Sequence, residues 1–70
     1  MSVQTILLLL EAALKIYPTV APLISQLVSH AKNAAAGIPV TESDIDATLN
    51  QYGTNRAQLA AAIAAKALAP

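Results

Sequence analysis

Residues 3–18 read VQTILLLLEAALKIYP, and this stretch decides what kind of fold the chain can form. Strong helix formers fill most of its positions, and Ser2 stands directly before them as an N-cap candidate. Pro18 ends or kinks the helix at the residue before it. We therefore predict a helix over residues 3–16. The pattern leaves open whether the chain then folds back as a hairpin or runs on with a kink at Pro18.

This first helix is apolar on nearly every side. Gln4, Glu11 and Lys15 form one narrow polar stripe at helical spacing, and almost all the other positions are apolar. A single hairpin partner hides only one face of a helix, so a second chain or another partner is expected to cover the rest. The predicted protein interface consists of five leucines: Leu7, Leu10, Leu14, Leu23 and Leu27.

The second predicted helix covers residues 19–36. Its apolar residues recur at spacings of three and four, which is typical of an amphipathic helix. Thr19 is expected to cap its start, and Pro22 is tolerated because the first-turn amides have no partner within a helix. Gly37 is suited to the position that follows the helix.

The third predicted helix, over residues 42–52, has the clearest start signal in the chain. Thr41 is the expected N-cap, and acidic residues follow in the first turn, where they favour the helix dipole. Val40 and Ile45 have the spacing of a hydrophobic staple across that cap. Gly53 is expected to end this helix.

The last predicted helix covers residues 55–69, is rich in alanine, and has Thr54 or Asn55 as its cap. No stretch alternates as a half-buried strand does. The expected fold is therefore all-α, with three to four helices in two hairpins. We expect one domain over residues 1–70, formed from an apolar hairpin (1–37) and a capped helix-turn-helix (38–70).

Length and composition point to association. A chain of 70 residues has a marginal core, and with no cysteine it cannot add a disulfide. Apolar residues make up 56% of the chain and charged residues 11%, against an ordinary charged fraction of about 25%. So few charged side chains can cover only part of the surface, and much apolar surface is expected to lie against another molecule.

The candidate chemical sites all favour structural interpretations. His30 lies on the polar face of the second helix with no carboxylate placed to orient it, so we expect a solvated, dispensable side chain rather than a catalyst. The acidic run that begins at Asp44 resembles the opening of a calcium loop, but Leu49 replaces the required glycine and Asn55 the required glutamate. No catalytic residue, metal, cofactor or small-molecule ligand is expected.

Nucleic acid is not an expected partner either. The net charge is zero, so no long-range field draws the chain to phosphates. The last helix carries Arg56 and Lys66, whereas the helix before it carries three acidic residues. A helix-turn-helix that reads DNA needs several basic residues on its second helix.

We therefore expect a non-catalytic structural or assembly protein that acts in a homo-oligomer or a larger complex, such as a virion, scaffold or adaptor component. The alternative is a small membrane-associated helical hairpin of the pore or lysis type, because the 3–28 stretch reaches spanning length if it continues through Pro18. Residues 1–4 lack the basic segment of a secretory signal. The expected location is the cytoplasm or an assembled particle.

Overall fold

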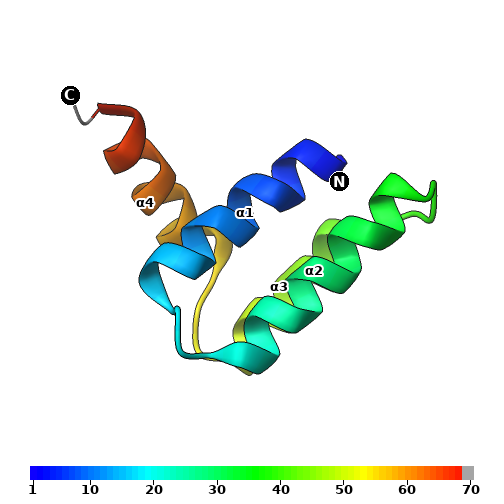
Figure 1. Ribbon diagram of the computed structural model, residues 1–70, viewed down its shortest axis with the longest axis horizontal. Helices are drawn as coiled ribbons and strands as arrows, with labels where there is room; N and C mark the ends of the chain where they lie inside the picture. Colours follow the sequence, from blue (N-terminus) through cyan, green and yellow to red (C-terminus); the bar gives the residue numbers. More distant parts are fainter. Residues whose placement is uncertain (69–70) are drawn as a thin grey trace.

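The computed structural model describes the backbone of residues 1–68 and the side chains of residues 1–64. Four α-helices follow one another along the described residues, which confirms the predicted all-α fold. Ala69, the last residue of the predicted fourth helix, lies outside the described residues. The helices are α1 (Val3–Ile16), α2 (Ala21–Ala35), α3 (Glu42–Gln51) and α4 (Arg56–Leu68) (Figure 1).

Helix α1 lies at the centre of the packing. It contacts α2 on one side and α4 on the other, and α2 in turn packs against α3. Figure 1 shows α2 running back antiparallel to α1, so the chain turns at residues 17–20 and does not continue as one kinked helix. Because α4 packs on α1, the two halves of the chain share one core.

The core draws side chains from all four helices. A single cluster of buried apolar residues connects them, and its largest members are fully shielded from solvent. Because a small core has few such residues, each of them carries a large share of the stability. These largest buried side chains are Ile6, Leu23, Leu27, Ile45, Leu49 and Leu59.

Two predicted caps start their helices where the sequence places them. The amide of Thr5 donates to Ser2 Oγ (3.2 Å) at the start of α1. At the start of α3, the amide of Asp44 donates to Thr41 Oγ1 (3.2 Å), and the amide of Thr41 donates to Asp44 Oδ2 (3.0 Å). This reciprocal pair is a capping box, which satisfies two amides that a helix start leaves without partners.

The start of α2 corrects the sequence-based prediction. The helix begins at Ala21, its N-cap is Val20, and no side chain caps it. Had Thr19 been the cap, Pro22 would have occupied the third helical position, where the amide that the cap bonds is missing. For α4 the choice between two candidates is settled, because the amide of Gln58 donates to Asn55 Oδ1 (2.9 Å).

The two glycines end α2 and α3 as predicted. Gly37 has φ +83° and Gly53 has φ +75°, a left-handed conformation that side chains other than glycine's rarely adopt. After Gly53, the amide of Thr54 reaches back to the carbonyl of Leu49 (3.1 Å), which satisfies a carbonyl at the helix end. These turns set the directions in which α3 and α4 leave.

Candidate protein-interaction surface

Helix α1 carries two apolar stripes, each with residues three and four positions apart. The inner stripe, Ile6, Leu9 and Ala13, is buried against the other helices. A second stripe, which we call the outer stripe, lies roughly a quarter-turn or more away around the same helix. It consists of Val3, Leu7, Leu10 and Leu14.

The outer stripe is only partly covered by the rest of the chain. Leu7 is 47% exposed and Leu14 is 48% exposed, while Leu10 between them is half-buried against the core. Spacings of four, three and four residues are those of the apolar seam along which two helices pack. The structure therefore brings together the three leucines of α1 that the sequence nominates for an interface.

Leu23 and Leu27 lie elsewhere. Both are fully buried in the chain's own core, so in this conformation they offer no surface to a partner. The sequence nominated them because they belong to the apolar face of α2. That face turns out to be the one that packs inside the molecule, against α1 and α3.

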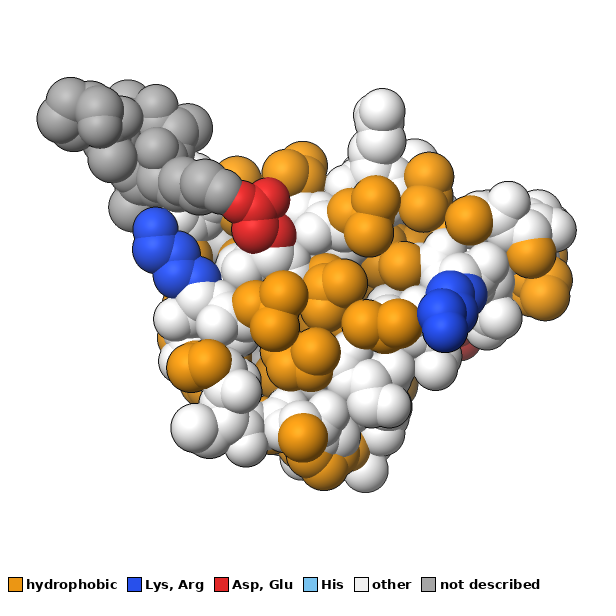
Figure 2. Space-filling model, viewed as in Figure 1, with side chains coloured by type: hydrophobic (Ala, Val, Ile, Leu, Met, Phe, Trp, Pro, Cys, Tyr) orange, Lys and Arg blue, Asp and Glu red, His pale blue; other side chains and the backbone are white. Residues whose placement is uncertain are grey.

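A different flank of α2 extends the outer stripe. Gln26 and His30 of α2 form hydrogen bonds to residues of α3 and its C-cap, whereas Ile24 and Val28 lie on the other flank of the helix by their spacing. Both are half-buried. Figure 2 shows hydrophobic side chains gathered over this side of the molecule, with charged side chains at its margins. We call the outer stripe together with Ile24 and Val28 the α1–α2 face.

Other apolar side chains, which are not among the five leucines of the predicted interface, are exposed outside this face. Leu8, on the far side of the polar stripe of α1, is 48% exposed beside a shallow hollow that Ala60 and Ile63 of α4 also line. Ile38, in the turn before α3, is 53% exposed. These side chains are exposed because no other helix covers them. The spacing of apolar residues in the sequence does not predict which helix covers which side chain.

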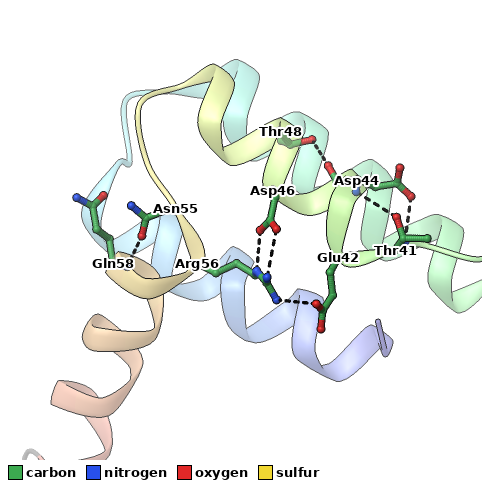
Figure 3. A network of polar contacts seen from close by, with 8 residues as sticks. All are labelled: Thr41, Glu42, Asp44, Asp46, Thr48, Asn55, Arg56 and Gln58. Atoms are coloured by element: carbon green, nitrogen blue, oxygen red, sulfur yellow. Dashed lines mark hydrogen bonds and ion pairs between the residues drawn. The ribbon is translucent and has the colours of Figure 1, made fainter.

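The acidic residues of α3 serve the fold. Arg56, the first residue of α4, donates from Nε to Asp46 Oδ1 (2.6 Å) and from Nη2 to Asp46 Oδ2 (3.1 Å) (Figure 3). Its Nη1 also lies 3.4 Å from Glu42 Oε2. The hydrogen bond that Arg56 donates to the carboxylate of Asp46 raises the pKa of Arg56 above its ordinary value. This clamp joins α4 to α3. Arg56 and Asp46 are ten residues apart in the sequence, so no local sequence pattern predicted their contact.

The structure corrects the sequence-based view of His30. Its Nε2 lies 2.9 Å from Thr48 Oγ1, so the imidazole links α2 to α3 instead of being solvated alone. Thr48 is almost fully buried, and its hydroxyl also donates to the carbonyl of Asp44 (3.2 Å). His30 therefore has a structural partner.

The part of the chain that the structure describes holds neither a metal cluster nor a membrane-spanning helix. Within it, no three His, Cys, Asp or Glu side chains come together as a metal site would need. None of the helices among these residues has the length and apolar character needed to cross a bilayer.

No protein family model, curated protein or solved structure matches this chain. The assignment of a function therefore depends on the geometry of this molecule.

Proposed function

We propose that this chain is a non-catalytic assembly module that works by packing its α1–α2 face against another protein, either a copy of itself or a larger complex. The observation that carries this proposal is the state of α1. Its inner stripe already fills the core, yet Leu7 and Leu14 on its outer stripe remain about half exposed. Single exposed leucines are ordinary, but a periodic apolar stripe is typical of an interaction surface.

The polar residues support the non-catalytic part of the proposal. The side chains that could act as an acid or a base in catalysis form contacts that stabilise the helices. His30 contacts Thr48, Asp44 caps α3, and Asp46 binds Arg56. Asp44 has a pKa below its ordinary value because the amide of Thr41 and then its side chain donate to it. A depressed carboxylate of this kind suits a helix cap better than a proton-transfer site.

Magnitudes indicate how large the interface must be. Burying a leucine completely is worth about 2 kcal/mol, so covering the exposed halves of Leu7 and Leu14 contributes roughly 1 kcal/mol each. Association costs about 4 kcal/mol or more in lost freedom. The two leucines contribute about 2 kcal/mol from one chain and about 4 kcal/mol from two copies, which at best equals that cost, so the contact must extend over the rest of the α1–α2 face.

The test measures how the melting temperature depends on protein concentration. If folding and assembly are coupled, the melting temperature of the wild-type chain rises with concentration. In Leu14→Glu that dependence should disappear, because a carboxylate in the seam opposes burial. The matched control is Gln4→Glu, which places the same group at an exposed position of α1 outside the outer stripe and should keep the dependence.

Two outcomes would count against the proposal. A wild-type melting temperature that is constant over a hundredfold range of concentration would mean that the chain does not assemble with itself. A concentration dependence that Leu14→Glu and Leu7→Glu both retain would place the assembly surface elsewhere on the molecule.

A further inference from the structure

We infer that α4 is a cover on α1, one that opens and closes while α1, α2 and α3 stay folded. In the docked state α4 packs on α1 where Leu9 is only 5% exposed, and Leu9 lines the seam between them together with Ile63 of α4. When α4 opens, this apolar flank of α1 becomes accessible to solvent. The movement takes place within one chain, so the inference goes beyond the proposed function and does not depend on a partner.

Few side chains of α4 reach the core. Among residues 56–64, whose side chains the structure describes, only Leu59 is buried, whereas each of the other helices buries three or more residues. Ala62 and Ile63 are partly buried. Alanine favours the helix itself but brings little apolar area to a contact. The docking of α4 is therefore weak compared with the packing among the other three helices, and weakly held elements are the ones that open first.

The arrangement of the helices allows α4 to leave alone. The main packing contact of α4 is with α1, while α2 packs against both α1 and α3. Figure 1 shows α2 and α3 running along each other, with α4 directed away from them. Opening of α4 therefore breaks one helix packing and keeps the α1–α2 and α2–α3 packing intact.

The seam between α1 and α4 is incompletely filled. A shallow hollow of about 380 Å³ lies along it, with Leu8 and Leu9 of α1 on one side and Ala60 and Ile63 of α4 on the other. Leu8 is 48% exposed there, and Ala60 is too short to cover it. Protein cores are close-packed, so a hollow means that α4 docks with only part of the surface that faces α1.

The polar contacts of α4 are open to water. In the clamp, the side chain of Arg56 is 39% exposed, that of Asp46 is 40% exposed and that of Glu42 is 70% exposed. Ion pairs that water reaches add little stability. The hydrogen bond that Tyr17 donates to Gln58 Oε1 is long, at 3.3 Å, and exposed. These contacts orient α4 in its docked position without holding it there firmly.

Native-state hydrogen exchange of the full chain at low urea concentrations tests the inference. We expect the amides of residues 60–64 to exchange about tenfold faster or more than the central amides of α1 and α2, with a weaker dependence on urea because less surface is exposed. Ala60→Leu fills the hollow and should slow exchange in α4 about fivefold, the effect of half burying a leucine. The matched control is Ala61→Leu, which lies on the opposite side of α4 from the buried Leu59 and should change nothing.

Two further variants distinguish opening of α4 from other motions. His30→Ala breaks a bond between α2 and α3 that the open state keeps, so it should speed exchange in α1 and α2 about fivefold and leave α4 unchanged. Arg56→Gln breaks the clamp and should speed exchange in α4 about threefold. If His30→Ala speeds α4 equally, α4 is released only when the whole chain unfolds, and the inference is wrong. Exchange in α4 that neither Ala60→Leu slows nor Arg56→Gln speeds would indicate fraying of the helix and would also overturn it.

Discussion

Thr48 shows at the scale of a residue how one buried hydroxyl connects two helices. A hydroxyl has one hydrogen, and Thr48 Oγ1 donates it to the carbonyl of Asp44 (3.2 Å). Its contact with His30 Nε2 (2.9 Å) must then be one in which the imidazole donates. His30 carries its proton on Nε2 in this arrangement, and the bond fixes α2 against α3.

The first prediction concerns His30. Replacing it with Ala removes the donor and should lower the free energy of unfolding by about 1 kcal/mol, the usual net value of such a bond. His30→Gln can still donate from its amide and should lose less. Urea unfolding of both variants, with the exposed neighbour variant Ser29→Ala as control, measures this. Equal stability of His30→Ala and wild type would mean that the bond contributes nothing.

A second prediction concerns pH and Asp44. Its pKa is lowered in the folded chain, first by the hydrogen bond from the backbone of Thr41. A lowered pKa means that the ionised group stabilises the fold above the ordinary pKa of about 3.9, and that this contribution is lost as the pH falls toward the lower folded value. Wild type should therefore exceed Asp44→Asn in stability at pH 7, with a gap that narrows below about pH 3.9. A gap that stays the same from pH 7 to pH 2 would contradict the assignment.

At the scale of an element, the conformation at the end of each helix sets the direction of the next helix. Gly53 ends α3 in the left-handed region, with φ +75°, and α4 begins three residues later at Arg56. A Cβ at Gly53 would meet no atom of the described residues within 4 Å. Any cost of a side chain there is therefore a backbone cost and not a clash.

The third prediction concerns Gly53, where only the backbone conformation opposes a side chain. Gly53→Ala should lower the free energy of unfolding by about 1 kcal/mol, the cost of holding an alanine in the left-handed region. Gly53→Asn should lose less, because asparagine visits this region more readily. Thermal unfolding monitored by circular dichroism compares the three chains. If both variants melt as wild type does, α3 does not end in the left-handed conformation in solution.

The elements also show what sequence can and cannot predict. The starts of α1 and α3 were predicted correctly because their caps, Ser2 and Thr41, are local signals. The start of α2 was wrong by two residues because Pro22 lacks the amide that Thr19 would need. Helix existence follows from propensity, and a helix boundary depends on the few hydrogen bonds at its end.

The exposure of the five leucines nominated for an interface could be predicted only in part, for a reason that belongs to the packing. Leu7 and Leu27 are equivalent in a periodicity, since both lie on apolar stripes, yet one is nearly half exposed and the other is fully buried. Which stripe faces inward depends on which helices dock against it: α2 and α4 pack on α1, and α1 and α3 pack on α2. The contact of α4 with α1 joins residues far apart in the chain. The clamp between Arg56 and Asp46 escaped prediction for the same reason.

At the scale of the whole molecule, the protein has a small core, and helix α1 contributes to it with only one of its two apolar stripes. The inner stripe of α1 organises the other helices, and its outer stripe is available to a partner. A chain of 70 residues is near the size at which a single core is marginal. Assembly through the α1–α2 face would bury apolar surface that the isolated chain leaves exposed, and would thereby stabilise the folded state.

The most direct test of this account is the molar mass of the wild-type chain in solution, measured by light scattering after size exclusion without detergent. The mass of one chain is 7.2 kDa. The account predicts a species of two or more chains at micromolar concentration that falls toward a single chain on dilution, and that Leu14→Glu prevents. A stable, folded species with the mass of one chain at every concentration tested would contradict it.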